Sequence, residues 1–298
     1  MCSEGSKFVA ATEKPPMPST EFSGGPSVLP GWSLRSKSFV VTGGTKGIGL
    51  GVARSLLVHG ASGLIICARG DCEKIASELQ REFTSAQVRG VQCDVSTAEG
   101  RSTLVGEVRK AFGSILDGLI NNVGVNIRKD ITDQTEEEYN CIMRTNVDSA
   151  YFLCKEFKDM LANAASRGDG AAVVNIASAA GVGSTGTGAA YGISKAAMIH
   201  LSKILACEWG KLNIRVNTVA PWMTMTPMLE EAVKNNPGQL DKVKEWTPMH
   251  RLPTVEDNVG TITFLCMPSS KYVTGQIISV DGGLSAQVFD GPCVTFPS

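Results

Sequence analysis

The sequence predicts an α/β fold, a single-domain doubly wound (Rossmann), mostly parallel sheet with helices on both faces. Apolar runs of strand length alternate with amphipathic stretches of helical length along most of the 298 residues, and this alternation is typical of βαβ units. A glycine-rich turn follows the first apolar run and opens the first helical stretch, as in folds that bind a dinucleotide. A chain of this length commonly forms one domain of this kind.

Seven apolar runs are predicted to be strands because they are short, apolar and bounded by turn residues. They cover residues 39–42, 64–68, 89–93, 118–121, 171–176, 214–219 and 277–280. Parallel strands joined by right-handed crossovers all end at one rim of the sheet, and ligands bind beyond that rim. Polar residues that closely follow a strand are therefore the candidates for a functional site.

The two ends of the chain are expected to lie outside the domain. Residues 1–33 are rich in Pro, Ser, Gly and Glu, which predicts a disordered N-terminal tail. We expect the domain over residues 34–287, with a substrate lid at about 222–250, and a C-terminal tail over 288–298. The N-terminal tail lacks the apolar run of a signal peptide. The cytoplasm is the expected location, with organellar targeting by the tail as the alternative.

Composition argues against several classes of partner. The formal net charge is −1 and no cluster of Lys and Arg stands out, so we expect neither nucleic acid nor a membrane as a partner. The nine cysteines show no CxxC spacing and the three histidines are scattered, so no metal site is expected. Cysteines of this kind suit a reducing compartment.

The glycine-rich turn reads Thr-Gly-Gly-Thr-Lys-Gly-Ile-Gly over residues 42–49. Glycines in this setting let the backbone approach a pyrophosphate at a helix N-terminus. The turn residues that we expect to contact a cofactor are Gly43, Thr45, Lys46, Gly47, Ile48 and Gly49.

Tyr191 and Lys195 lie four residues apart at the start of a helical stretch, so their side chains share one face of the helix. A phenol with an ordinary pKa of about 10 holds its proton tightly at neutral pH, and a nearby cation favours the phenolate. Such a pair can move protons in a reaction. The same spacing also occurs by chance on amphipathic helices, so the functional interpretation depends on the other motifs.

With these motifs, the chain resembles the short-chain dehydrogenase/reductase family over residues 34–284. Further matches follow in the family's order: Asp94 in Cys-Asp-Val, Asn-Asn-Val-Gly at 121–124, Asn146, Ser178, Asn-Thr-Val-Ala-Pro at 217–221 and Val-Asp-Gly-Gly at 280–283. The family usually has Pro-Gly where this chain has Pro221-Trp222, and this variant most resembles the tropinone-reductase-like branch. The resemblance implies an oxidoreductase that transfers a hydride between a nicotinamide cofactor and a carbonyl or alcohol carbon.

The resemblance also implies roles for four residues. Tyr191 would be the general acid in reduction and the base in oxidation. Lys195 would lower the pKa of this tyrosine and hold the nicotinamide ribose. Ser178 would stabilise the charge on the carbonyl oxygen, and Asn146 would anchor a water that relays protons to Lys195. Taken alone, Asn146 could simply cap the helix that follows it.

The end of the second predicted strand indicates the choice of cofactor. NAD-binding folds carry an acidic residue there, whereas this chain has Ala68 followed by Arg69. Arg69 and Lys46 offer cations to a 2′-phosphate, so NADP(H) is the expected cofactor. The resemblance adds cofactor contacts at Asp94, Val95, Asn121, Val123, Gly124, Tyr191, Lys195, Pro221, Trp222, Thr224 and Thr226. Among these, Thr226 could equally cap the next helix.

The substrate is expected to lie against a mainly apolar set of residues beside the tyrosine. These are Ser178, Ala180, Val182, Thr185, Thr187, Tyr191, Trp222, Met223, Met225, Met228 and Leu229. None of them is charged, which favours a small, largely apolar ketone, such as a cyclic one, for a carbonyl reductase. The family resemblance implies a homodimer or homotetramer joined through residues 191–210.

Two other functions fit the same motifs. A 3-oxoacyl-carrier-protein reductase would need basic residues at the mouth of the site to dock an acidic carrier, and Arg128 and Lys129 could serve. A non-catalytic NADP-binding scaffold has no physical need for the four catalytic residues, so the sequence favours it least.

Overall fold

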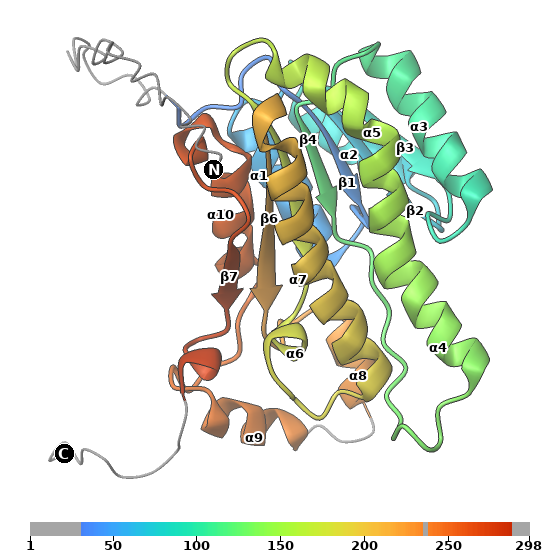
Figure 1. Cartoon of the computed structure of the whole chain (residues 1–298), viewed down its shortest axis with the longest axis vertical. Helices are drawn as coiled ribbons and strands as arrows, with labels where there is room; N and C mark the ends of the chain where they lie inside the picture. Colours follow the sequence, from blue (N-terminus) through green and yellow to red (C-terminus); the bar gives the residue numbers. More distant parts are fainter. Residues whose placement is uncertain (1–30, 235–237, 288–298) are drawn as a thin grey trace, which may run out of the picture.

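The computed structural model describes residues 31–234 and 238–287 and contains a seven-stranded parallel sheet. Its strands are β1 (Ser38–Thr42), β2 (Gly63–Ala68), β3 (Gln87–Gln92), β4 (Gly118–Asn121), β5 (Ala171–Ile176), β6 (Ile214–Pro221) and β7 (Ile277–Val280). Their order across the sheet is β3-β2-β1-β4-β5-β6-β7 (Figure 1). The predicted fold class is confirmed, and the strand order changes direction between β1 and β4, where sheets of this type bind ligands.

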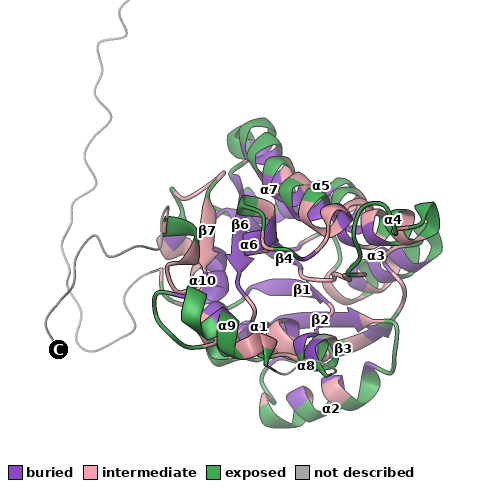
Figure 2. Ribbon diagram, turned by 90° about the horizontal axis from the view of Figure 1, so that it is seen from below, coloured by how far each residue is buried: buried purple, intermediate pink, exposed green. Residues whose placement is uncertain are grey.

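Helices cover both faces of this sheet, and α6, α8 and α9 lie beyond the carboxyl ends of its strands (Figure 1). The helices of the described residues are α1 (Gly47–Val58), α2 (Glu73–Glu82), α3 (Ala98–Phe112), α4 (Glu136–Met143), α5 (Ser149–Ala165), α6 (Ala179–Val182), α7 (Ala189–Trp209), α8 (Pro227–Val233), α9 (Gln239–Trp246) and α10 (Val255–Cys266). Helices α3, α5 and α7 pack on one face, and α1, α2 and α10 pack on the other. In Figure 2 the buried sides of these helices face the sheet.

The strands supply one apolar residue to each face in turn. Along β1, Val40 packs with the α3, α5 and α7 side of the core, whereas Phe39 and Val41 pack with the α1, α2 and α10 side. This alternation follows from the period of two in an extended chain. All residues of β5 and β6 are buried, as expected for central strands with helices on both faces.

The edge strand β3 is the strand that the sequence placed least well. It begins at Gln87, two residues before the predicted start, and ends at Gln92. Only Val88 and Val91 are buried in it. Because an edge strand has one neighbour, it lacks the continuous apolar run that marks a central strand.

The predicted tails lie largely outside the described residues, namely residues 1–30 and 288–298. Residues 31–33 were assigned to the N-terminal tail, but they contact the domain. The Trp32 ring lies 5.8 Å from the ring of Phe264, and the Gly31 carbonyl accepts a hydrogen bond from the Ser269 amide at 3.0 Å. Contacts with the domain therefore start at least as early as Gly31.

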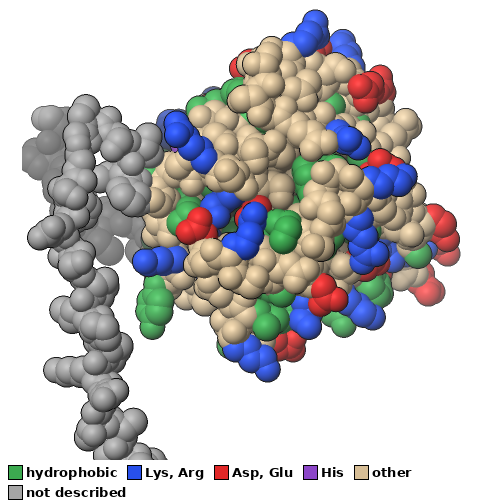
Figure 3. Space-filling view, turned by 90° about the horizontal axis from the view of Figure 1, so that it is seen from above, with side chains coloured by type: hydrophobic (Ala, Val, Ile, Leu, Met, Phe, Trp, Pro, Cys, Tyr) green, Lys and Arg blue, Asp and Glu red, His purple; other side chains and the backbone are tan. Residues whose placement is uncertain are grey.

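The amino ends of the strands carry a charged cluster on the side of the sheet away from the site. Asp117 is buried and accepts hydrogen bonds from the Ser38 amide at 2.9 Å and from Arg167. Lys37 also pairs with Asp169 at 3.0 Å. Basic and acidic side chains are interspersed across this face (Figure 3). Within the described residues, no helix is long and apolar enough to cross a membrane.

Candidate functional site

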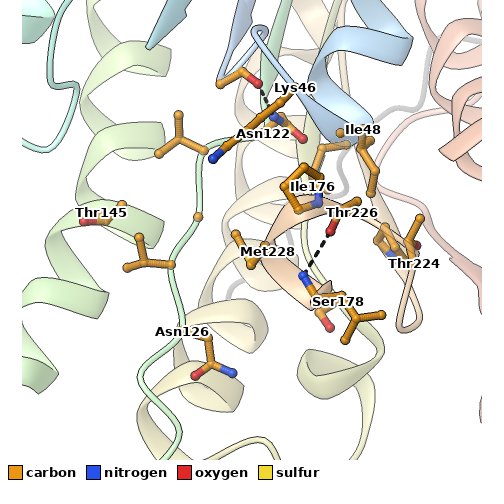
Figure 4. A pocket seen from close by; sticks show the side chains of 18 of the residues that line it. Lys46, Ile48, Asn122, Asn126, Thr145, Ile176, Ser178, Thr224, Thr226 and Met228 are labelled. Carbon is orange, nitrogen blue, oxygen red and sulfur yellow. Dashed lines mark hydrogen bonds between the residues drawn. The ribbon is translucent and has the colours of Figure 1, made fainter. Parts of the chain in front are cut away.

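The loops at the carboxyl ends of β1 to β6 surround one cavity of about 660 Å³. Its walls include residues from the glycine-rich turn, the ends of β2 and β3, the loop after β4, the segment around Ser178, helix α7 and the loop after β6. In Figure 4, Lys46 lies at one end of this cavity, and Asn126 and Ser178 lie at the other. Residues that were predicted from separate motifs therefore line one cavity.

The glycine-rich turn has a backbone that other residues would strain. Gly43 and Gly47 have positive φ angles of 66° and 54°, a conformation that L-residues with a side chain rarely adopt. At Gly49, an added Cβ would lie 2.2 Å from the Gly43 carbonyl oxygen. Gly49 does not line the cavity. Its part is to let helix α1 start directly against the turn, so that the first amides of the helix face the cavity.

Asn122, which the motif analysis did not single out, fixes this turn. Its Nδ2 donates to the carbonyl oxygens of Thr42 at 2.9 Å and Gly43 at 3.2 Å, and its backbone amide donates to Thr42 Oγ1 at 2.9 Å. The predicted cofactor contact Asn121 instead points into the core. It donates to Asn175 Oδ1 at 2.8 Å and does not line the cavity. Because Asn121 ends β4, its side chain follows the alternation of the strand.

Two cations lie at the end of the cavity formed by β1 and β2. Lys46 and Arg69 both line it and are exposed, and neither forms an ion pair with another described residue. Ala68 lies beside them. Gln92 donates to the Arg69 carbonyl at 3.0 Å, which holds the backbone that carries this arginine. Two cations that form no ion pair within the described residues can bind a phosphate group.

Other predicted cofactor contacts also line the cavity. These residues are Gly43, Thr45, Gly47, Ile48, Asp94, Val95, Val123, Gly124, Tyr191, Lys195, Pro221, Trp222, Thr224 and Thr226. The Thr226 hydroxyl caps α8 by accepting from the Leu229 amide at 3.4 Å. Both interpretations of Thr226 are therefore compatible with its position.

Ser178, Tyr191 and Lys195 lie together at the other end. Helix α7 presents both Tyr191 and Lys195 to the cavity, and Lys195 Nζ lies 5.7 Å from the centre of the Tyr191 ring. Lys195 is buried and donates to the Ile176 carbonyl at 2.9 Å. Ser178 follows Ile176 by two residues at the end of β5, so this strand positions both the ammonium and the hydroxyl.

The protonation of this pair is governed mainly by burial. Burial raises the pKa of Tyr191, and a hydrogen bond with Ser178 and the charge of Arg128 act in the opposite direction. Burial also lowers the pKa of Lys195 to about 8. The sequence led us to expect a lowered pKa for the tyrosine. The net shift in this chain is upward because the desolvation of the phenolate outweighs the nearby donors and cations, so the phenol holds its proton at neutral pH.

Asn146 lies behind the cavity wall and does not line it. Its Oδ1 accepts from the Val125 amide at 2.8 Å, and its Nδ2 donates to the Val125 carbonyl at 3.0 Å and to Ser194 Oγ at 2.9 Å. It sits in a π-helical turn (Arg144–Asp148) between α4 and α5, and so it does not cap α5. Such turns inside helices often occur at functional sites.

Most of the predicted substrate contacts line the cavity. Those that do are Ser178, Thr185, Thr187, Tyr191, Trp222, Met223, Met228 and Leu229. Ala180, Val182 and Met225 are not among the lining residues. Ala180 is buried, whereas Val182 and Met225 are exposed to solvent. Their directions depend on short loops and turns whose path the sequence pattern does not define.

Several lining residues were predicted neither as cofactor nor as substrate contacts, among them Asn126, Arg128, Thr145 and Glu231. Arg128 and Glu231 are charged, and the charge of Arg128 acts on Tyr191, so the expectation of an uncharged lining beside the tyrosine was wrong. Asn126 and Arg128 belong to the segment after Asn-Asn-Val-Gly. The sequence named Arg128 only as a cation that could dock an acidic carrier. The position of this segment directly behind a strand end was the signal that could have indicated a place in the site.

Trp222 links the loop after β6 to α9. Its Nε1 donates to Thr247 Oγ1 at 3.1 Å, and its ring packs with Ala179 and Val243. Both Trp222 and Val243 are buried. The C-terminal end of α9 is therefore held against the cavity by a residue that also lines it.

Known proteins are similar to this chain in sequence and in fold. Residues 43–285 match a family model described as enoyl-(acyl carrier protein) reductase. A tropinone reductase homolog from Arabidopsis thaliana is 39% identical over 258 residues, which cover 87% of this chain and 96% of the relative. The structure of Pseudomonas aeruginosa RhlG with NADP has a TM-score of 0.79 and 31% identity, over 87% of this chain and 100% of that chain.

A gluconate 5-dehydrogenase from Burkholderia cenocepacia, solved in complex with NADP and tartrate, has a TM-score of 0.76 and 27% identity, over 86% of this chain and 98% of that chain. The resemblance inferred from the motifs is thus confirmed by a family model that spans nearly the whole domain and by a relative of similar length. The chain belongs to the short-chain dehydrogenase/reductase family, and its curated relatives include tropinone reductase homologs.

Proposed function

We propose that this protein is an NADP(H)-dependent oxidoreductase that interconverts a carbonyl group and a secondary alcohol on a small, largely apolar substrate. The observation that carries the proposal is the arrangement of one cavity, with Ser178, Tyr191 and Lys195 at one end and Lys46 and Arg69 at the other. The first group suits proton transfer to an oxygen, and the second suits a phosphate.

The residues present fit NADP(H). The strained glycines of the turn leave the backbone open to a pyrophosphate, and Lys46 and Arg69 would hold the 2′-phosphate. Asp94 and Val95 would contact the adenine, and Gly124 the adenosine ribose. The related structures from Pseudomonas aeruginosa and Burkholderia cenocepacia were solved with NADP, which supports the same choice here.

When bound, the nicotinamide supplies or accepts the hydride. In reduction, the Tyr191 phenol would give its proton to the substrate oxygen as the carbonyl carbon becomes a carbinol. Ser178 lines the cavity beside Tyr191 and would donate to the same oxygen as negative charge develops on it. Because burial keeps the pKa of Tyr191 high in the chain alone, the phenol starts the reduction in its protonated form.

Lys195 and Asn146 would complete the proton path. Lys195 would hold the nicotinamide ribose and favour the phenolate after proton transfer. Asn146 fixes the backbone of Val125 and the hydroxyl of Ser194. We propose that it orders a water beside Lys195 through the remaining lone pair of its Oδ1.

The lining beside Tyr191 supports a small ketone, such as a cyclic one. Trp222, Met223, Met228 and Leu229 provide apolar surface, while Thr185 and Thr187 provide hydroxyls. We propose that residues 222–250, which include α8 and α9, act as the substrate lid, since Trp222 connects them to the cavity.

The proposal is tested by measuring NADPH oxidation over a panel of cyclic ketones, quinones and acyl thioesters. We expect turnover of at least one cyclic ketone, and its loss in Tyr191→Phe. If the wild type binds NADPH but turns over no member of the panel, the non-catalytic scaffold is favoured and the proposal fails. If NADPH does not bind, both interpretations fail.

A 3-oxoacyl-carrier-protein reductase is the second candidate, because the family model that matches carries the description of an acyl-carrier-protein reductase. Docking of an acidic carrier needs free cations at the mouth of the site. Of the two expected cations, Lys129 forms an ion pair with Glu138 at 2.7 Å. Its charge is therefore not free to bind an acidic carrier. Turnover that requires a carrier-linked thioester and ignores the free ketones would favour this second function.

We further propose assembly into a homodimer or homotetramer through the helix that carries Tyr191 and Lys195. Ile193 and Ile204 on α7 expose about half of their side-chain surface, which supports an apolar contact along this helix. Measuring the mass of the protein in solution tests this assembly.

We also propose a cytoplasmic location, supported by the free thiols of the seven cysteines in the described part of the chain.

A further inference from the structure

Arg128 is a charged residue at the substrate end of the cavity. It lies in the segment after β4 and lines the same wall as Asn126, which Figure 4 places at the end of the cavity away from Lys46. Its charge acts on the Tyr191 phenol, so the guanidinium lies near the reacting end. Lys46 and Arg69, the two cations proposed to bind the cofactor, lie at the other end of the cavity.

The segment just before Arg128 is held by hydrogen bonds of side chains. Asn146 binds both the amide and the carbonyl of Val125. Asn126 Nδ2 donates to the Thr187 carbonyl at 3.2 Å, and Gln134 Nε2 donates to the Ile127 carbonyl at 3.1 Å. The bond from Asn126 to Thr187 holds the segment against the loop before α7. A long side chain on a fixed backbone is suited to bind a ligand at a defined place.

The guanidinium of Arg128 has no carboxylate partner within residues 31–234 and 238–287. The neighbouring Lys129 differs in this respect, because it pairs with Glu138. Arginine presents several donors in one plane, which match the two oxygens of a carboxylate. Arg128 is exposed to solvent and also lines the cavity, so its free donors are accessible to a planar anion that enters there.

We propose that Arg128 binds a carboxylate of the substrate, and that the protein acts on small keto acids or hydroxy acids whose remaining surface is apolar. This inference rests on the proposed function and narrows its substrate class. It would make Arg128 a specificity-determining residue, whereas Ser178 and Tyr191 act on the reacting oxygen.

Glu231 on α8 is a rival partner for Arg128, because it also lines the cavity. Its carboxylate is 77% exposed and lies 3.8 Å from Lys234 Nζ, so it is largely solvated. If Arg128 served to bind Glu231 and close α8 over the cavity, neutralising either residue would affect all substrates alike. If Arg128 binds the substrate, Glu231→Gln would leave the preference for an acid intact or strengthen it, since a repelling charge is removed.

The test uses a matched pair of ketones, 4-oxocyclohexanecarboxylate and its methyl ester, with NADPH. We expect the ratio of kcat/KM for the acid to that for the ester to fall about tenfold to a hundredfold in Arg128→Met, the effect of one charge-assisted hydrogen bond. Arg128→Lys should recover part of the ratio. The control Lys129→Met removes the adjacent cation and should leave the ratio unchanged.

Calorimetric binding of the acid in the presence of NADP⁺ gives a second readout that does not need turnover. The wild type should bind the acid, and Arg128→Met should bind it at least tenfold more weakly. A wild type that does not bind the acid, an unchanged ratio in Arg128→Met, or an equal loss for acid and ester would overturn the inference. Continued turnover of the ester in that case would show that the proposed function still holds.

Discussion

Lys195 Nζ donates a hydrogen bond to the carbonyl of Ile176 at 2.9 Å. The bond joins helix α7 to the end of β5, two residues before Ser178, and so it sets the ammonium and the serine hydroxyl at fixed positions around Tyr191. The ammonium is buried, and its surroundings include no carboxylate partner among the ion pairs of the described residues. Burying an unpaired ammonium destabilises the folded chain. The same ammonium can bind an anion or a ribose hydroxyl.

The first prediction concerns the pH dependence of stability. Burial lowers the pKa of Lys195 from 10.5 to about 8, so between these values the unfolded state binds more protons than the folded state. The free energy of unfolding must therefore rise with pH across that window. The destabilisation caused by the buried ammonium is complete below about pH 8. Urea unfolding of the wild type and Lys195→Met without cofactor should show curves that approach each other as the pH rises. Parallel curves would contradict the assignment.

The second prediction is that Tyr191→Phe removes the proton donor while the ring packing stays. Turnover should fall by about two to four orders of magnitude, the usual contribution of general acid catalysis, with NADPH binding little changed. Tyr151→Phe is a matched control because Tyr151 is exposed on α5 and does not line the cavity. If Tyr191→Phe retained more than about a tenth of the turnover with chemistry rate-limiting, its role would be different.

The third prediction concerns the choice between NADPH and NADH. Ala68→Asp should offer a carboxylate to the ribose hydroxyls and repel the 2′-phosphate, so the preference should move toward NADH. Arg69→Ala should weaken NADPH alone by about tenfold to a hundredfold. The measurement is kcat/KM for both cofactors, with the exposed Arg109→Ala on α3 as a control. A wild type that prefers NADH would refute the assignment.

The fourth prediction concerns the glycine-rich turn. At Gly49 an added Cβ would approach the Gly43 carbonyl to 2.2 Å, so Gly49→Ala must displace the turn or the helix. We expect a lower melting temperature and NADPH binding at least about tenfold weaker. Gly106 lies within α3, where an added Cβ meets no atom within 4 Å, so Gly106→Ala should stabilise by about 0.4 to 1 kcal/mol. Equal behaviour of the two variants would contradict the steric argument.

The fifth prediction concerns the contact between Trp222 and α9. Thr247→Val keeps the shape of the side chain but removes the acceptor of the indole N–H. Leaving this buried donor unpaired should cost about 1 to 3 kcal/mol, and the KM for ketones should rise as α9 loosens. Thr247→Ser keeps a hydroxyl and should retain most of both properties. A Thr247→Val protein with unchanged stability and KM would show that the bond does not hold α9.

The sequence alone predicted much of the site because several of its features are local. The four-residue spacing of Tyr191 and Lys195 puts both on one face of α7 whatever the rest of the chain does. The glycines of the turn are required by the backbone itself, and Ala68 and Arg69 follow directly from the end of β2. For such residues the local conformation sets the direction of the side chain.

Other residues were placed only by contacts between distant segments. Sequence could not separate Asn121 from Asn122, yet the first points into the core and the second holds the turn. Asn146 took its place through bonds to Val125 and Ser194, which lie in other parts of the chain. Arg128 depends on the path of a segment that has no regular secondary structure.

The sequence by itself thus determined the fold class, the family, the cofactor type and the residues carried by regular elements, because apolar periodicity and glycine positions act over a few residues. The tertiary structure decided which loop residues face the cavity, the direction of the pKa shift of Tyr191 and the presence of Arg128 at the substrate end. These properties depend on burial and on hydrogen bonds between segments far apart in the chain, which no local pattern encodes.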